Sequence, residues 1–172
     1  MKRPRRGPSR LTGLRCRAKA KPLDPHQQRI YGWEEDWPGW NHNHLSLGQC
    51  RALVAIVCAH YKVPCPTVTQ HDNGTYAWSA PSFNRISMQG GEHMRRGSRN
   101  VSTVMHEAAH HVAWHLYGER IQDHGPAFLG VFLDCLVMAK VAPRIALEAS
   151  ARAHGLKWRS PERALARRCD GA

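Results

Sequence analysis

Two histidines and a glutamate within five residues could do chemistry together. The segment reads His106-Glu107-Ala-Ala-His110, an HExxH motif. On a helix, residues four apart project from the same face, so His106 and His110 can present two imidazoles to one metal ion. Glu107 lies one step round the helix, where its carboxylate can hold and deprotonate a water molecule. This pattern is typical of a zinc hydrolase, which needs neutral nitrogen ligands, an open coordination position and a general base.

A catalytic zinc site takes three protein ligands, so a third must come from elsewhere in the chain. The metzincin pattern needs a glycine and a histidine where this chain has Ala113 and Leu116, and no glutamate is placed as a gluzincin requires. Among the loop residues that remain, His124 is the strongest candidate, because Gly125 allows a sharp turn and Pro126 suits the first turn of a helix. The alternative is that His124 only caps that helix.

Two further residues are candidates for supporting the ligands. Asp123 could accept a hydrogen bond from the N–H of a ligand histidine, a common second contact of a metal-bound imidazole. His111 and His115 are also four residues apart, but at helical pitch they point about 100° away from the first pair. We expect them at the surface or behind the ligands, with His111 able to assist substrate binding.

The two motifs resemble those of a known family. HEAAHHVAW followed by HGPAF is similar to the SprT-like metallopeptidases, in which a third histidine before a glycine follows HExxH. It is more similar still to a group of small metallohydrolases of bacteria and phages that show HExAHH, HGPxF and a helix-rich C-terminus. The resemblance covers roughly residues 25–156 and is specific only between 103 and 128.

The resemblance implies a zincin-like fold, a zinc ion held by His106, His110 and His124, and Glu107 as the catalytic residue. The chain departs from the family in one respect: it lacks the CxxC…CxxC zinc ribbon that some SprT-like proteins carry after the catalytic region. The smaller group is poorly characterised, so the resemblance implies no particular substrate.

Apolar residues at helical spacing predict a helix from Val101 to Leu116, which would carry the HExxH motif. Asn100 or Ser102 could cap its start, and Gly118 could end it. Two more helices are expected downstream, over 126–139 and from Pro143 to about His154.

Upstream of the motif, the pattern predicts a helix over 45–61, with Ser46 as its cap and Gln49 completing a capping box. Three short strands are expected to follow, over 67–70, 75–79 and 85–88. Asp72-Asn73-Gly74 suits a hairpin between the first two. The last strand is the candidate for an edge strand that aligns an extended peptide beside the metal. The predicted fold is α+β, a minimal zincin-like domain with an N-terminal helix, a three-stranded sheet, the HExxH helix and C-terminal helices.

The positive charge lies at the two ends of the chain. The formal net charge is +12; residues 1–22 hold nine Lys or Arg and no acid, and residues 23–151 are close to neutral. We expect a disordered basic arm over 1–22, a metallohydrolase domain over 23–156 and a basic C-terminal tail over 157–172. The arm could bind nucleic acid through its phosphates, or it could be only a solubilising tail.

The leading hypothesis is a zinc metallopeptidase with a protein or peptide substrate. A narrower form of this hypothesis is that the substrate is a protein bound to nucleic acid. The alternative is a non-enzymatic, zinc-braced nucleic-acid-binding or regulatory module. Such a structural site needs four protein ligands, so Asp123 or His42 would have to provide the fourth. The chain has no apolar stretch typical of a secretory signal or a membrane span, which predicts a cytoplasmic protein with no membrane partner.

Overall fold

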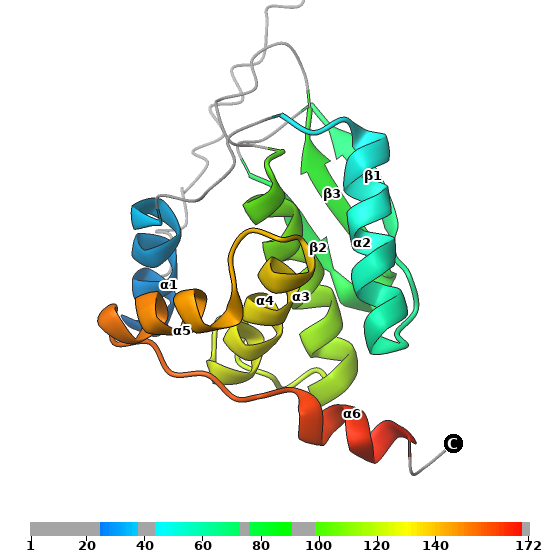
Figure 1. Ribbon diagram of the computed structural model, residues 1–172. Coiled ribbons are helices and arrows are strands. Elements are labelled where there is room, and N and C mark those ends of the chain that lie inside the picture. Colours follow the sequence, from blue (N-terminus) through cyan, green and yellow to red (C-terminus); the bar gives the residue numbers. More distant parts are fainter. Residues whose placement is uncertain (1–24, 38–43, 73–75, 91–98, 170–172) are drawn as a thin grey trace, which may run out of the picture.

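The described part of the protein is an α+β structure of six α-helices and one small sheet (Figure 1). The computed structural model describes residues 25–37, 44–72, 76–90 and 99–169. In chain order the elements are α1 (Pro25–Asp36), α2 (Leu47–Tyr61), β1 (Thr67–His71), β2 (Trp78–Ala80), the 3-10 helix η1 (Pro81–Phe83), β3 (Arg85–Gln89), α3 (Val101–Tyr117), α4 (Pro126–Met138), α5 (Arg144–Ala153) and α6 (Glu162–Cys169). The predicted α+β class is confirmed. Within these ranges, no helix is long and apolar enough to cross a membrane.

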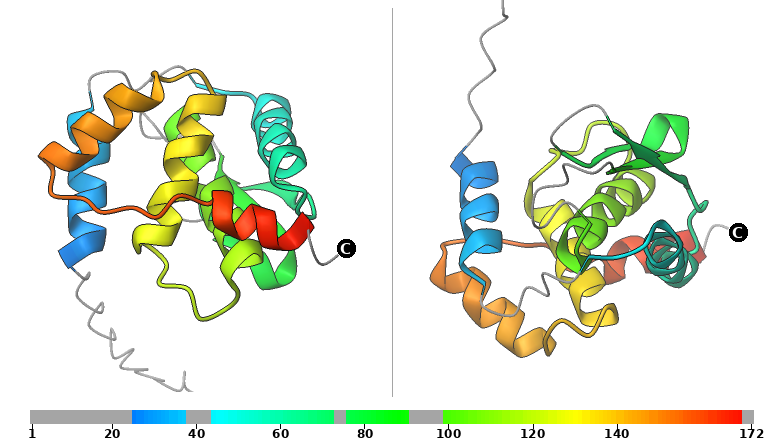
Figure 2. Two further views of the ribbon diagram at one scale, coloured as in Figure 1. Left: turned by 60° about the horizontal axis from the view of Figure 1, so that its bottom comes forward. Right: turned by 90° about the horizontal axis from the view of Figure 1, so that it is seen from above.

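Helix α3, which carries the HExxH motif, is the central element. It contacts α2, α4, α6 and strands β2 and β3, and the other elements surround it in Figures 1 and 2. The Asn100 side chain accepts a hydrogen bond from the Thr103 N–H at 2.7 Å, and the helix ends at Gly118, whose φ is 85°. The cap is therefore Asn100 and not Ser102. Apolar residues on nearly every side explain why this helix is buried.

The sheet has the strand order β1-β3-β2. Strand β3 is parallel to β1, with Arg85 opposite Thr67, and antiparallel to β2, with Ser87 opposite Trp78. After Arg85, every residue of β3 is buried. A continuous run of buried residues is typical of a strand that is covered on both faces.

This strand order corrects two predictions. The predicted hairpin between 67–70 and 75–79 does not form, because β1 and β2 both pair with β3 and not with each other. An Asn-Gly step favours a tight turn locally, but the burial of β3 requires a neighbour on each side; residues 73–75 themselves lie outside the described ranges. For the same reason 85–88 is not an edge strand, since both of its edges are occupied.

The predicted capping box of helix α2 is confirmed, but the helix begins two residues later than predicted. The Ser46 hydroxyl accepts a hydrogen bond from the Gln49 N–H at 3.2 Å, and the Gln49 side chain accepts one from the Ser46 N–H at 2.8 Å. This reciprocal capping box places the first helical residue at Leu47.

Helix α1 was not among the predicted elements. It packs through Ile30 and Trp33, which are both completely buried, and the Trp33 indole N–H donates a hydrogen bond to the Ser150 hydroxyl at 3.0 Å. The first and fifth helices are therefore joined across 117 residues of sequence. Pro25 at the first helical position and the spacing of the two apolar residues are the local signals for this helix.

The C-terminal segment is packed on the domain, although the sequence suggested a tail from residue 157. The Arg159 N–H donates to the Pro126 carbonyl at 2.8 Å, and Ala164 on α6 is buried. In Figure 2 the segment runs from α5 across α4 to α6. The packed part of the chain therefore extends past the predicted boundary at 156. The predicted basic arm, 1–22, lies outside the described residues.

Gly130 on α4 allows this segment to pass close to the helix, because a Cβ at this position would lie 1.8 Å from the Arg159 carbonyl oxygen. We expect Gly130→Ala to lower the free energy of unfolding by about 1–3 kcal/mol, as overpacking does. Urea denaturation measures this change. Gly32→Ala on α1 is the control, since nothing lies within 4 Å of its new methyl group, and it should stabilise the helix by about 0.5–1 kcal/mol. Equal effects of the two substitutions would contradict the close approach.

Candidate metal centre

Three imidazole nitrogens meet at one point. The Nε2 atoms of His106 and His110 are 3.1 Å apart, those of His106 and His124 are 3.1 Å apart, and those of His110 and His124 are 3.3 Å apart. Among the described residues these three side chains form a group that could hold a metal ion. Nitrogens bound about 2.0–2.1 Å from one ion at tetrahedral angles would be roughly 3.3–3.4 Å apart, so the observed spacing fits such an ion.

Two different elements bring the ligands together. His106 and His110 project from one face of α3, and His124 precedes α4 at a tight turn in which the Gly125 N–H donates to the Gln122 carbonyl at 2.9 Å. A Cβ at Gly125 would lie 2.9 Å from the Gln122 Cβ, so the turn requires a glycine. His124 thus occupies the helix-start position that its sequence context suggested, and its imidazole faces the other two.

Two phenylalanines of α4 form the wall behind the ligands. The Phe128 ring is stacked on His110 with centroids 4.3 Å apart, and the Phe132 ring contacts His106 at 5.4 Å. Both phenylalanines are completely buried. Packing on this scale restricts the imidazoles to few rotamers and holds the Nε2 atoms in place.

Glu34 on α1 orients His106, a role that the sequence suggested for Asp123. The Nδ1 atom of His106 lies 2.8 Å from the Glu34 carboxylate. With a proton on Nδ1 donated to Glu34, the Nε2 lone pair of His106 faces the other two histidines, as metal binding requires. Asp123 is exposed at the mouth of the site, and no hydrogen bond joins it to a ligand histidine among the described residues.

His111 does not lie at the surface. It is completely buried, and its Nε2 atom is 2.8 Å from the carbonyl oxygen of Pro64, in the segment after α2. With the proton on Nε2, this bond ties α3 to α2. The expected surface position of His111 is therefore wrong, because the 100° rotation directs its side chain into the core, and His111 is not among the residues that line the cavity of the three histidines.

Helix α1 adds two more contacts to His124. The Tyr31 hydroxyl lies 3.3 Å from its Nε2 atom and accepts a hydrogen bond from Gln27 at 3.2 Å. The Nδ1 atom of His26 lies 2.5 Å from the His124 carbonyl oxygen. Burial raises the pKa of Tyr31 above its usual value, so its hydroxyl keeps its proton near neutral pH. No motif in the sequence marks these residues, although their helical spacing from Glu34 would place them on one side of a helix.

Burial determines the charge of the central groups. It raises the pKa of Glu107 to about 7, although His106 nearby opposes the rise. Burial, with His106 and His124 close by, lowers the pKa of His110 well below its usual value, so this imidazole is neutral and can act as a ligand. Burial also disfavours charge on His106, but the Glu34 carboxylate outweighs it and raises the pKa of His106.

The histidines open into a cavity of about 280 Å³. One side is formed by the three ligands with Glu107 and Tyr31, and the other by Ala77, Trp78 and Ser79, at or just before strand β2. The strand beside the site is therefore β2, an edge of the sheet, and not the segment 85–88. The indole of Trp78 is partly exposed at this edge.

Comparison of the chain with models of known protein families, with characterised proteins and with solved structures gives no match. The likeness to SprT-like proteins therefore stays an expectation carried by the motif residues. His42, the alternative fourth ligand, lies outside the described residues.

The contact between Glu34 and His106 predicts a strong effect on metal binding. We expect Glu34→Gln to weaken zinc affinity by about 10–100-fold, because the amide no longer holds the ligand in the required orientation and tautomer. Competition with a chromogenic chelator measures the affinity. Glu35→Gln removes the same charge from the next, exposed residue of α1 and should leave the affinity unchanged. Equal affinities of the two variants would show that Glu34 does not orient the ligand.

Proposed function

We propose that this protein is a zinc-dependent metallopeptidase with a minimal zincin-like domain, similar to the SprT-like enzymes. The observation that carries the proposal is the convergence of three imidazole Nε2 atoms with the Glu107 carboxylate in one solvent-accessible cavity. Glu107 is buried and lines this cavity, and a buried carboxylate beside three nitrogen ligands is the arrangement of a general base.

The donor set suits zinc. Three neutral imidazoles are a common ligand set of catalytic zinc, and among the described residues no fourth His, Cys, Asp or Glu joins the group. Bound there, zinc would act as a Lewis acid and lower the pKa of a coordinated water from 15.7 to about 7. This open ligand set argues against the alternative of a zinc-braced module, which requires a closed site with four protein ligands.

Glu107 would move the proton. Its side chain lines the same cavity as the ligands, so it can accept a proton from the attacking water and deliver it to the leaving nitrogen of the peptide. Its burial keeps competing bulk water away and strengthens its interaction with the reacting groups.

Tyr31 would stabilise the negative charge that develops on the carbonyl oxygen. Its hydroxyl lies beside the point where the three Nε2 atoms meet and keeps its proton near neutral pH. A fixed O–H donor at the position where charge develops lowers the barrier without having to reorganise during the reaction.

Strand β2 would hold the substrate. Its outer edge, which no other strand of the described residues occupies, lies next to the cavity, and an extended peptide could pair with the main-chain groups of this edge. Pairing of this kind positions a peptide bond with little selectivity for side chains. Action on proteins bound to nucleic acid is a narrower form of the proposal, supported by the basic residues at both ends of the chain.

Glu107→Gln tests the proposed base. It should lower the rate of peptide hydrolysis by about 10²–10⁴-fold while zinc still binds, because the amide keeps the shape of the side chain but cannot accept the proton. Cleavage of a fluorogenic peptide library, alongside zinc content by atomic absorption, measures both properties. Glu119→Gln, at an exposed acid just after α3, is the control. Full activity of Glu107→Gln would rule out the mechanism.

Tyr31→Phe tests the oxyanion donor. It removes one hydroxyl from the site and should lower kcat by about 10²–10³-fold, with zinc affinity unchanged, since the ring still packs on the ligands. Tyr76→Phe removes a hydroxyl from a side chain that is 81% exposed and should have no effect. A loss of zinc affinity that matches the loss of kcat would show that Tyr31 supports the ligands and does not stabilise charge.

A further inference from the structure

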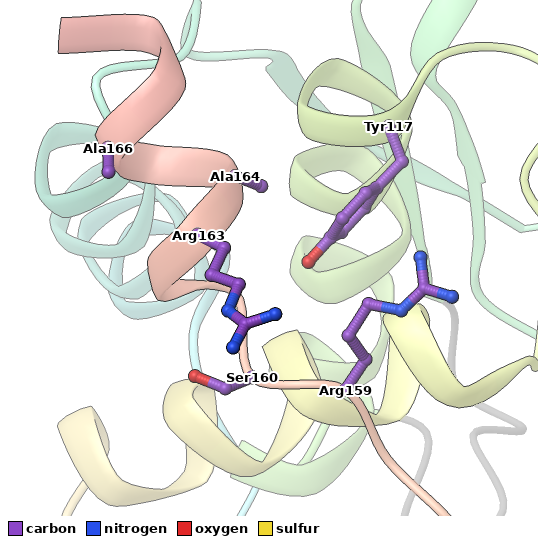
Figure 3. Close-up of a pocket in the computed structure, with 6 residues that line it drawn as sticks. All are labelled: Tyr117, Arg159, Ser160, Arg163, Ala164 and Ala166. Atoms are coloured by element: carbon purple, nitrogen blue, oxygen red, sulfur yellow. The ribbon is translucent and has the colours of Figure 1, made fainter.

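A second hollow lies at the end of α3, beside the C-terminal segment. Its volume is about 540 Å³, and it is lined by Tyr117, Arg159, Ser160 and three residues of α6. Figure 3 shows the Tyr117 hydroxyl directed toward Arg163 on α6, and the Arg159 guanidinium on the other side of Tyr117, directed away from Arg163. None of the residues that line this hollow also lines the histidine cavity, so the two are separate sites.

The two arginines have no acidic partner. Neither Arg159 nor Arg163 forms an ion pair or side-chain hydrogen bond within the part of the chain that the structure describes. Arg144 and Arg152 nearby in the sequence differ, because both pair with Glu148. No acidic residue lines the hollow. Two arginines and two residues with hydroxyl groups therefore line one hollow without a nearby acid, and the ligand that complements them, once the Arg159 side chain turns toward Arg163, is an anion.

The backbone that carries these arginines is held in place. The Arg159 N–H donates to the Pro126 carbonyl at 2.8 Å, and the carbonyl of Arg159 rests against Gly130. The Pro161 carbonyl accepts hydrogen bonds from the first turn of α6, at 2.9 and 3.0 Å. Because both arginines start from a fixed backbone, a ligand has only their side chains to order on binding.

We infer that this hollow binds a phosphate group, with Arg159 and Arg163 as the cationic donors and Ser160 and Tyr117 as hydroxyl donors. A phosphate carries up to two negative charges, and its oxygens point in several directions, so it can accept from donors on different sides of a hollow. A carboxylate is planar and carries one charge. The inference does not depend on the metal centre or on its proposed activity.

The phosphate could belong to a nucleic-acid strand or be a free ion, and one experiment separates these sources. The full-length protein is compared with the double variant Arg159→Gln/Arg163→Gln. Arg29→Gln/Arg85→Gln is the control, because it removes two charges at exposed arginines that also lack partners among the described residues. The probes are a short fluorescein-labelled single-stranded DNA, followed by anisotropy over a salt series, and inorganic phosphate, which is added as competitor and also titrated alone by calorimetry.

If the phosphate belongs to nucleic acid, the Arg159/Arg163 variant should bind DNA about tenfold more weakly than the control variant at physiological salt. The slope of log K against log salt should fall by about one for each arginine that contacts a phosphate. Inorganic phosphate that competes with DNA only when both arginines are present also supports the site. Phosphate binding that requires the pair, with DNA affinity equal in the two variants, supports the phosphate site and identifies a free phosphate as the source.

Equal losses of both DNA binding and phosphate binding in the two double variants overturn the inference, because they would show an effect of net charge alone. Equal phosphate and DNA binding by all three proteins also overturns it. Tyr117→Phe gives an independent check that keeps every charge: it should weaken binding about two- to tenfold through the loss of one hydrogen bond. Thermal unfolding of each variant confirms that the domain is folded before binding is compared.

Discussion

The contact between Glu34 and His106 is the interaction on which the metal centre depends. It decides which nitrogen of His106 faces the other two histidines, and it joins α1 to the central helix α3. Three nitrogen lone pairs at 3.1–3.3 Å repel one another unless a cation lies between them. The structure therefore places three imidazoles so that together they could hold a metal ion.

The rest of the domain keeps this arrangement from relaxing. Phe128 and Phe132 pack behind the imidazoles, and the bond of Trp33 to Ser150 holds the helix that carries Glu34. The C-terminal segment adds a second layer, since it crosses α4 at Gly130. These groups form a rigid back to the cavity, and the residues at strand β2 form the wall that faces it.

One helix positions two sites of opposite character. The cavity around His110 contains acidic side chains and imidazoles, whereas the hollow at Tyr117 contains arginines without acidic partners among the described residues. These two residues are seven apart on α3, or roughly 10 Å along the helix axis.

Local patterns in the sequence were enough to predict α3 with its two histidines and the capping box of α2. They also predicted the turn that presents His124. All three features depend only on residues close together in the sequence: the helical spacing of the histidines, the cap of a helix and a Gly-Pro step. The sequence did not reveal the role of Glu34, which meets its histidine across 72 residues, or the order of the strands. The pairing of β1 with β3 depends on which faces are buried once the helices pack. That is a property of the whole chain, and only the tertiary structure decides it.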